Sequence, residues 1–312
     1  MRHAFLMDPI EDVRIDQDST FALMMEAQRR GHEVLYGTID GLDQRGGRAR
    51  AVLQSANLRS VQGDHVSLGP ATRLDLGELD VIWMRKDPPF DMGYIFCTYL
   101  LDLASRDALV VNHPDGLRAM NEKAWAMAFP DLVPESLITQ SQADLRAFAE
   151  ELGSIVVKPL DGNGGEGVFI VTADDPNRGV ILEMSTRHGS RKVLAQRYLP
   201  EAREGDKRII LVDGVAVGAC LRVPSGVDHR GNIHVGARVA SCALTDRDRE
   251  ICEAIGPALA EAGQIFVGID VIGDFLTEVN VTSPTCIHEI NRFDGIRIEA
   301  LTLDAVEARL PA

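Results

Sequence analysis

A lysine and a loop dense in glycine lie between two hydrophobic segments near the middle of the chain, and this pattern constrains the fold most. Residues 154–157 read as a strand leading to Lys158, and residues 168–171 read as the next strand. The glycines of the intervening loop are Gly162, Gly164, Gly165 and Gly167. Glycines let backbone N–H groups approach phosphate oxygens, and the lysine adds a positive charge at the same place. The segment predicts a flap over bound phosphates, with a flexible hairpin tip as the alternative.

Two familiar phosphate loops do not fit this segment. The sequence contains no G-x-x-x-x-G-K-[ST] motif, which excludes a P-loop kinase. A dinucleotide-binding fingerprint follows a strand and opens a helix, whereas a strand follows the glycines here. The pattern therefore favours a different nucleotide-binding architecture.

The first third of the chain alternates strand and helix signals. Strands are predicted at residues 3–7, 33–36, 80–84 and 109–112. A helix is predicted at residues 19–30, begun by a Ser/Thr cap and ended by Gly31. This alternation predicts a small parallel sheet flanked by helices, while the pattern between residues 40 and 80 is too weak to assign.

The remaining chain reads as longer strands joined by glycine-rich turns. Residues 114–129 read as a helix before them. Further strands are predicted at residues 193–196, 208–212, 215–221, 265–272 and 275–281, and helices at 246–262 and 300–309. A chain of 312 residues has room for two or three compact units. We predict an α/β fold, with a parallel-sheet domain at residues 1–119 and two α+β lobes at residues 120–200 and 201–312.

Composition restricts the partners and the compartment. The net charge of −15 opposes binding to nucleic acid or an anionic membrane, both of which require a basic surface. No apolar run approaches the roughly 18 residues that span a bilayer, and the N-terminus lacks a signal-peptide pattern. The five cysteines are scattered, without a C-x-x-C pair. We expect a reduced, cytoplasmic protein with small-molecule partners.

Oxygen-bearing side chains near the C-terminus predict a metal site. Glu278 and Asn280 lie two residues apart in a predicted strand, so their side chains share one face. Carboxylate and amide oxygens are ligands of the kind that Mg²⁺ prefers. A strict two-residue turn after residue 272 would place Asp270 on the opposite face, whereas a three-residue connection, residues 273–275, with a bulge would pair it with Glu278. We predict the second arrangement; the alternative is a hairpin face with solvated acids.

Charged residues cluster between the flap and this hairpin. Those at the ends of predicted strands are Asp206, Lys207, Arg208 and Arg222. Residues 224–238 contain three glycines and Arg230, with little hydrophobic periodicity. A mobile cationic loop beside a nucleotide site predicts a lid over an anionic intermediate, and a solvated surface loop is the alternative.

Three further cations lie upstream. Arg85 and Lys86 come just past the end of a predicted parallel strand, where ligands of open α/β sheets bind. Lys123 is a candidate phosphate cation, with an exposed helical lysine as the alternative.

Six short motifs carry a resemblance to a known family. They are Met7-Asp8-Pro9-Ile10, residues 85–90, Asn121-Glu122-Lys123, residues 158–162, residues 205–208 and residues 280–286. In this order and spacing the chain resembles the bacterial glutathione synthetases of the ATP-grasp superfamily, from about residue 4 to residue 310. The resemblance implies a pre-ATP-grasp N-terminal domain followed by a two-lobed ATP-grasp unit.

The resemblance also implies a reaction. Glycine is joined to γ-L-glutamyl-L-cysteine through an acyl phosphate, and ATP becomes ADP and phosphate. Such chemistry relies on positioning and charge neutralisation, so no side-chain nucleophile is required. The implied cofactor is Mg²⁺, or alternatively Mn²⁺, and the implied assembly is a homo-oligomer, a tetramer or a dimer.

Residue roles follow from the matched motifs. The resemblance implies catalytic roles for Arg208, Arg222 and Arg230, and metal binding by Asp270, Glu278 and Asn280. The implied ATP-binding residues are Lys123, Lys158, Gly162, Gly164, Gly165, Gly167, Gln196, Tyr198, Leu199 and Lys207. The implied substrate-binding residues are Arg85, Lys86, Asp206, Ser283, Pro284 and Thr285.

Two residues depart from the family pattern, and two alternative functions stay open. Glu166 stands in the flap where a small hydroxyl residue is more usual, and His288 stands where arginine is expected. One alternative is an ATP-grasp carboxylate–amine ligase with a different acceptor. The other is a non-catalytic nucleotide-binding sensor, which would not need the three predicted metal ligands.

Overall fold

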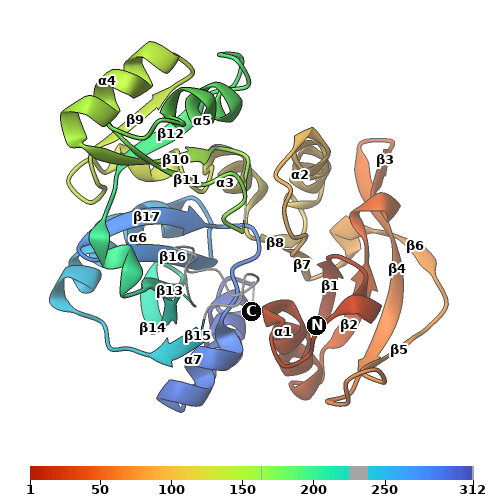
Figure 1. Ribbon diagram of the computed structural model, residues 1–312. Helices are drawn as coiled ribbons and strands as arrows, with labels where there is room; N and C mark the ends of the chain where they lie inside the picture. The colour runs from red at the N-terminus through yellow and green to blue at the C-terminus, as the bar shows by residue number, and fades with distance from the viewer. Residues whose placement is uncertain (163, 225–237, 311–312) are drawn as a thin grey trace.

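The computed structural model describes residues 1–162, 164–224 and 238–310, and its strands form three sheets. The sheets have eight, four and five strands in chain order. In Figure 1 the four-stranded sheet lies at the top left, the five-stranded sheet below it and the eight-stranded sheet to the right. None of the helices in the described part of the chain combines the length and apolar character that a bilayer crossing requires.

The parallel part of the first sheet matches the prediction. Its strands, in the order β2-β1-β7-β8, are β2 (Glu33–Gly37), β1 (Arg2–Leu6), β7 (Val81–Met84) and β8 (Leu109–Val111). These strands are almost continuously hydrophobic because both faces of a parallel sheet are covered. Helices α1 (Ser19–Arg29) and α2 (Met92–Ala104) flank them, and Asp18, rather than a Ser or Thr, caps α1 by accepting a hydrogen bond from the Phe21 N–H.

The weakly patterned residues 40–80 form an antiparallel extension of this sheet. Its strands are β3 (Asp43–Arg45), β4 (Arg48–Leu58), β5 (Val66–Leu68) and β6 (Thr72–Asp75). Strand β4 pairs with β2, β3, β5 and β6. Its buried positions include Ala49 and Ala51, and alanine gives only a weak hydrophobic signal, which explains why the strand was not predicted.

The single helix predicted at residues 114–129 is wrong. Helix α3 (Pro114–Ala119) ends early, and only a 3₁₀ turn, Trp125–Ala128, follows. Between them the Asn121 carboxamide oxygen accepts hydrogen bonds from the N–H groups of Lys123 and Ala124, at 3.1 and 2.9 Å. A local side-chain bond of this kind competes with the helix.

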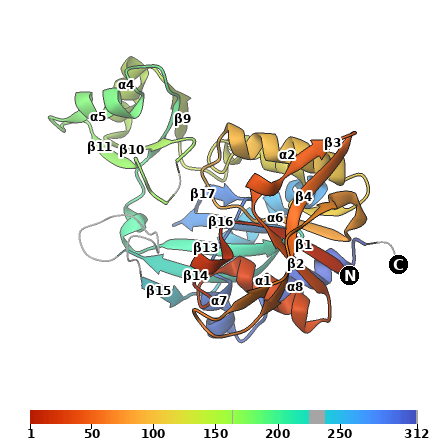
Figure 2. The same cartoon turned by 90° about the vertical axis from the view of Figure 1, so that its right-hand side faces the viewer.

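The second sheet forms a separate lobe with the order β11-β10-β12-β9. Its strands are β9 (Ser136–Thr139), β10 (Ser154–Pro159), β11 (Phe169–Thr172) and β12 (Val193–Arg197), all antiparallel. Helices α4 (Gln142–Leu152) and α5 (Arg178–Ser185) pack on it around a core that includes Leu145, Ile155 and Leu182. Figure 2 shows this lobe standing to one side of the other two sheets. The glycine loop joins β10 to β11.

The third sheet has the order β15-β14-β13-β16-β17. Its strands are β13 (Asp206–Val212), β14 (Val215–Val223), β15 (Arg238–Ser241), β16 (Phe266–Ile272) and β17 (Phe275–Asn280). Helix α6 (Asp246–Glu261) was predicted, α7 (Ile287–Asp294) was not, and α8 (Ile298–Glu307) corresponds to the predicted terminal helix. Buried side chains of the first and third sheets share two cores, so these sheets pack as one body while the second lobe keeps its own.

Candidate functional site

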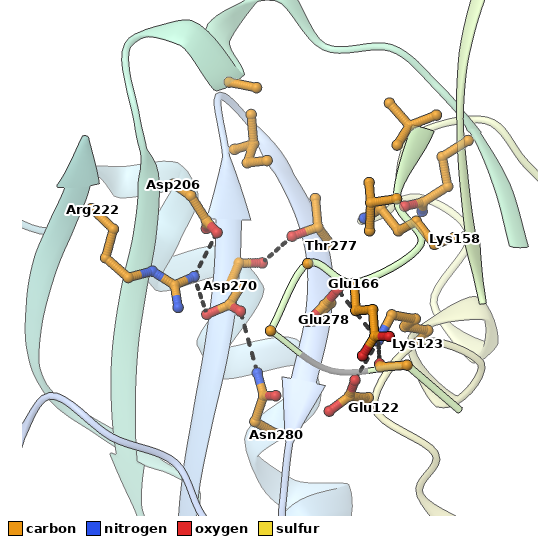
Figure 3. Close-up of a pocket in the computed structure, with 18 of the residues that line it drawn as sticks. Glu122, Lys123, Lys158, Glu166, Asp206, Arg222, Asp270, Thr277, Glu278 and Asn280 are labelled. Atoms are coloured by element: carbon orange, nitrogen blue, oxygen red, sulfur yellow. Dashed lines mark hydrogen bonds and ion pairs between the residues drawn. The ribbon is translucent and has the colours of Figure 1, made fainter. Parts of the chain in front are cut away.

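A cavity of about 910 Å³ lies where the four-stranded lobe faces the five-stranded sheet. Figure 3 shows side chains from both walls projecting into it, with Lys158 on one wall and Arg222, Asp206 and Asp270 on the other. Most predicted site residues line this cavity: Lys123, Lys158, Gly162, Gly164, Gly165, Gln196, Tyr198, Leu199, Asp206, Arg208, Arg222, Asp270, Glu278, Asn280, Ser283, Pro284 and Thr285. Residues distant in the sequence are therefore gathered at one place.

The hairpin of β16 and β17 pairs Asp270 with Glu278, as predicted, but by a different route. The connection is a strict two-residue turn, because Ile272 pairs with Phe275, and Gly273 supplies the positive φ of +57°. The register shifts next to Asp270, where Thr277 is the extra residue and its hydroxyl donates to the Asp270 carbonyl oxygen at 3.0 Å. The bulge therefore lies inside the strand pair and not at the turn.

Asp270 lies in a dense network of charges. Its carboxylate accepts two hydrogen bonds from Arg208, at 2.6 and 3.0 Å, and lies 3.0 Å from Arg222. The Asn280 amide donates to it at 3.3 Å. Burial opposes ionisation, but the two guanidinium groups prevail and hold the pKa of Asp270 well below its usual value.

Asp206 has the opposite electrostatic balance. Arg222 donates to one carboxylate oxygen at 2.5 Å, while the other, Oδ1, is buried and has no hydrogen-bond partner among the residues that the structure describes. Burial is the main reason that the pKa of Asp206 is raised to about 7; Arg222 opposes the rise, and the nearby charge of Asp270 adds to it. In Figure 3 Arg222 lies between the two carboxylates and contacts both.

Lys123 is buried at the base of the flap and is not the exposed helical lysine of the alternative interpretation. Its ammonium group donates to the Gly162 carbonyl oxygen at 2.7 Å, pairs with Glu122 and lies 3.6 Å from Glu278. Burial and the charge of Glu278 raise the pKa of Glu122. The Asn121 amide also donates to the Leu160 carbonyl oxygen at 2.8 Å, so this segment supports the start of the flap.

Lys158 is the penultimate residue of strand β10 and lines the cavity. Only 9 % of the residue is exposed, and no carboxylate pairs with it among the described residues. The flap glycines at 164, 165 and 167 have positive φ angles of 62°, 78° and 68°. Gly167 packs near Pro159 outside the cavity lining, whereas Glu166 belongs to the lining.

Part of the cavity lining is uncharged. It includes Gln196, Tyr198 and Leu199, together with Val156 and Ile272. The Gln196 side chain donates to the Ser136 hydroxyl at 3.0 Å, which fixes its orientation. A planar, uncharged group such as a nucleobase fits this surface better than a charged one.

Four predicted site residues lie outside the cavity lining: Gly167, described above, and Lys207, Lys86 and Arg85. Lys207 points to the opposite face of β13 from Asp206 and Arg208, where it pairs with Asp248, so we do not assign it to ATP. Lys86 pairs with Asp8 at 2.8 Å. Arg85 is buried behind the segment 282–284 and donates to the carbonyl oxygens of Thr282 and Pro284, at 3.1 and 3.3 Å. The predicted direct contacts of Arg85 and Lys86 with substrate are therefore not supported.

Two predictions concern the lid and the departures from the family pattern. Arg230 and most of the lid, residues 225–237, lie outside the described residues. The ring of His288 contacts the Asp18 carbonyl oxygen at 3.0 Å and lies outside the cavity lining. His288 therefore connects α7 to the cap of α1.

Sequence reasoning missed several residues of the lining. Glu122 is one of them, although it stands between the two motif residues Asn121 and Lys123. Thr277 was missed because its role depends on the position of the bulge. Asp87, Pro88 and Thr282 lie within the matched motifs at residues 85–90 and 280–286, but no role was predicted for them.

The donor set fits a hard divalent cation. Asp270, Glu278 and Asn280 offer oxygen atoms of the type that Mg²⁺ and Mn²⁺ accept. No group of three or more His, Cys, Asp or Glu side chains in the described ranges is arranged to hold a metal alone. Two carboxylates and an amide form an incomplete shell, which suits a cation that arrives with nucleotide phosphates.

Two family models together match nearly the whole chain. The N-terminal domain of prokaryotic glutathione synthetase matches residues 1–118, and the ATP-grasp domain of prokaryotic glutathione synthetase matches residues 122–295. A glutathione synthetase of Brucella melitensis biotype 1 is 52% identical over 309 residues, covering 99% of both chains. That of Escherichia coli strain K12 is 48% identical over 307 residues, covering 98% of this chain and 97% of its own.

Solved structures with low sequence identity share the fold. The D-cycloserine synthetase DcsG matches with a TM-score of 0.66 at 16% identity, over 99% of both chains. The ATP-grasp ligase PsnB, in a complex with a precursor variant, Mg and ADP, matches with a TM-score of 0.61 at 16% identity, over 98% of this chain and 97% of its own. The matches confirm the predicted α/β fold with an ATP-grasp unit. The chain is an ATP-dependent ligase that belongs to the prokaryotic glutathione synthetase family.

Proposed function

We propose that this chain joins glycine to the C-terminal carboxylate of γ-L-glutamyl-L-cysteine, with conversion of ATP to ADP and phosphate. The observation that carries the proposal is the composition of one cavity. Phosphate-binding cations, Lys123 and Lys158, face a wall that holds two arginines and the three oxygen ligands of the hairpin. The sequence identity of 52% and 48% to two glutathione synthetases, over nearly the full length of the chain, supports the choice of substrates.

The nucleotide lies between the two lobes in this proposal. The base contacts the uncharged lining residues Gln196 and Leu199, and the phosphates lie between Lys158 and Lys123 beneath the flap. Binding of phosphates beside Lys123 offers its ammonium group new partners in place of the Gly162 carbonyl oxygen, which frees the base of the flap. Gly164 and Gly165 then approach the phosphates with their backbone N–H groups.

A divalent cation, specifically Mg²⁺ with Mn²⁺ as the alternative, is held by Asp270, Glu278 and Asn280. The chemistry that it supplies when bound is neutralisation of charge on the phosphate oxygens. Arg208 and Arg222 already neutralise Asp270 in the structure, so this carboxylate has partners both with and without nucleotide.

Arg208 and Arg222 then face the transferring phosphoryl group. A carboxylate oxygen of the dipeptide attacks the γ-phosphorus, the bond from that phosphorus to the bridging oxygen of ADP breaks, and an acyl phosphate forms. The glycine amine attacks the acyl carbon, loses a proton, and displaces phosphate, which keeps the carboxylate oxygen. Two fixed guanidinium groups stabilise negative charge on the transferring group without reorganisation.

The remaining predicted residues complete the substrate side. Ser283, Pro284 and Thr285 form one edge of the cavity, next to Asn280, and are suited to hold the dipeptide. Asp206 is suited to accept hydrogen bonds from an ammonium group through Oδ1, which has no partner within the described part of the chain. The loop at residues 224–240, with Arg230, stays predicted as the lid that keeps water from the acyl phosphate.

We also propose the division into residues 1–119, 120–200 and 201–312, a homo-oligomeric assembly and a cytoplasmic location. The separate core of the four-stranded lobe supports the first of these. Sedimentation analysis of the purified protein tests the assembly, and a single 34.0 kDa species at all concentrations would contradict it.

A coupled assay of ADP release tests the function. We expect turnover with γ-glutamylcysteine and glycine, and little or none when another amino acid replaces glycine. ADP release that does not depend on γ-glutamylcysteine would favour a ligase with another acceptor. No ADP release with any carboxylate would favour a nucleotide sensor.

A further inference from the structure

Asn112 follows the carboxyl end of β8, and its side chain forms hydrogen bonds at the open end of the hairpin of β16 and β17. Its carboxamide oxygen accepts from the Phe266 N–H at 2.9 Å, and its amide donates to the carbonyl oxygens of Phe266 and Val281, at 2.8 and 2.7 Å. Phe266 begins β16, and Val281 follows Asn280 at the end of β17. One buried side chain therefore fixes the open end of the hairpin, opposite its turn.

Arg85, at the carboxyl end of the neighbouring strand β7, holds the next residues of the same segment. Its guanidinium donates to the carbonyl oxygens of Thr282 and Pro284 and, at 3.0 Å, to the Thr20 hydroxyl. It also lies 5.2 Å from the centre of the Phe266 ring. Only 4 % of Arg85 is exposed, and no ion pair of this side chain occurs in the described part of the chain. The partners of this buried guanidinium are therefore neutral acceptors and the face of an aromatic ring. Burial of a cation is costly unless its donors are hydrogen-bonded.

Arg85 and Asn112 both donate hydrogen bonds to the backbone of residues 281–284. Strands β7 and β8 are neighbours in the parallel sheet, so their carboxyl ends lie at one edge, which Figure 1 shows at the centre of the molecule. The carbonyl groups of Val281, Thr282 and Pro284 face this edge, while Thr282, Ser283, Pro284 and Thr285 line the cavity. Asn280 immediately precedes the stretch.

We propose that Arg85 and Asn112 are positioning residues, which clamp the backbone of residues 281–284 so that its cavity-facing side chains and the adjacent Asn280 stand in place for the dipeptide and the metal. The inference rests on the proposed function for the substrate that the segment receives. Arg85 acts through the Thr282 and Pro284 carbonyl groups and not through a contact with substrate. The N-terminal sheet thereby sets the geometry of a site whose chemistry belongs to the C-terminal sheet.

Two substitutions test the clamp by kinetics. Arg85→Lys keeps the charge but loses the planar fork that reaches two carbonyl groups, and Asn112→Ala loses all three bonds. Groups that orient ligating residues typically contribute roughly 10- to 100-fold. We expect each variant to lower kcat/KM for γ-glutamylcysteine by about that factor, with KM for ATP changed less than about threefold. The kcat/KM of the double variant should lie within about threefold of that of the less active single variant, because Arg85 and Asn112 hold the same segment.

Matched controls come from similar residues outside the clamp. Arg118 pairs with Asp102 on α2, and Asn291 bridges Glu299 and the Ile298 N–H between α7 and α8. Arg118→Lys and Asn291→Ala should leave both KM values near the wild-type values. Hydrogen exchange gives a readout independent of activity: the backbone N–H groups of residues 281–283 and of Thr285 should exchange faster in both clamp variants and in neither control.

Three outcomes would overturn the clamp. In one, Asn112→Ala lowers the melting temperature but leaves the kinetic constants and the exchange of residues 281–283 and Thr285 unchanged, which indicates a purely structural role. In another, Arg85→Lys raises KM for the dipeptide, Asn112→Ala does not, and exchange is unchanged, which indicates a direct substrate contact. In the third, the effects of the two substitutions multiply. If Asn112→Ala does not fold, Asn112→Ser carries the same comparison. A wild-type protein that does not ligate these substrates would refute the proposed function, while the exchange measurement still tests the clamp.

Discussion

Arg208 and Asp270 face each other across β13 and β16 and are joined by two parallel hydrogen bonds. The same carboxylate is paired with Glu278 across the hairpin and contacts Arg222. Asp270 thus lies between two arginines and the other predicted metal ligands. A carboxylate at this position neutralises the arginines before nucleotide binds and serves the cation afterwards, which explains its burial at the centre of the site.

Asp270→Asn should impair both stability and ligation. The substitution leaves Arg208 buried without its partner carboxylate, and breaking a buried pair costs about 3–5 kcal/mol of unfolding free energy. Loss of a metal ligand should reduce the ligation rate by at least about 100-fold. Urea unfolding without metal and ADP release measure the two effects. Asp213→Asn, which breaks an exposed pair with Arg309, is the control and should cost no more than about 1 kcal/mol. Wild-type values for both properties in Asp270→Asn would refute the central position of this carboxylate.

Lys158→Ala should abolish ligation without loss of stability. The lysine is buried in the cavity without a carboxylate partner among the described residues, so its removal relieves an unfavourable burial of charge. We expect a melting temperature equal to or above that of the wild type, and a kcat/KM for ATP lower by about 100-fold or more. Lys192→Ala, at an exposed position four residues before Gln196, is the control. Near-normal ligation in Lys158→Ala would show that the phosphate role is misassigned.

Glu166→Gln should tighten ATP binding. Glu166 lines the cavity on the flap, where its negative charge opposes the phosphates. A like charge at short range in a wet site contributes about 1 kcal/mol, so KM for ATP should fall by roughly two- to fivefold. Because salt screens this repulsion, the difference from the wild type should shrink at high ionic strength. An increase in KM would show instead that the carboxylate assists the nucleotide.

His3→Asn should reduce the loss of stability at acidic pH. Burial, followed by the charges of His32 and the N-terminus, lowers the pKa of His3 from 6.5 to about 3. A neutral His3 accepts the Trp83 indole N–H at 3.2 Å. As pH falls below about 6.5, His3 therefore binds a proton in the unfolded state but not in the folded state. The free energy of unfolding that depends on His3 is fully present above that pH and is lost as pH falls toward 3. The stability lost over this window is at most about 5 kcal/mol.

Fluorescence of the two tryptophans during acid titration measures this effect. Asn keeps an acceptor for the indole N–H but does not titrate in this range, so the unfolding midpoint of His3→Asn should move to lower pH. An unchanged midpoint would assign the acid sensitivity to other groups. His113→Asn is the control, since His113 caps α3 and does not contact Trp83.

The parallel strands and the β16–β17 hairpin were predictable because their signals are local. Strand β7 is a run of buried hydrophobic residues, and Glu278 and Asn280 share a face by strand alternation alone. The pairing of Asp270 with Glu278 was predicted correctly, but the position of the bulge was not, because the Thr277 hydrogen bond that accompanies it is not visible in the pattern. Lys207 is a different case: it was assigned to ATP, although strand alternation next to Asp206 and Arg208 predicts the opposite face, where the structure places it.

The clamp was not predictable from the sequence. Arg85 stands at the end of a parallel strand, where a ligand contact is the usual inference, but its partners are carbonyl groups about 200 residues away in the chain. Asn112 carries no pattern that separates it from an ordinary turn residue. Contacts of this kind depend on how two sheets pack, and backbone acceptors leave no trace in residue types.

Transfer of labelled oxygen tests the central claim most directly. γ-Glutamylcysteine with ¹⁸O in both oxygens of its C-terminal carboxylate is incubated with the protein, ATP, Mg²⁺ and glycine, and the products are analysed by mass spectrometry. We predict one ¹⁸O in the phosphate and one in the new amide for each glutathione formed, because the carboxylate oxygen that attacks phosphorus leaves with phosphate. Glutathione formation with unlabelled phosphate, or ADP release without glutathione, would contradict the account.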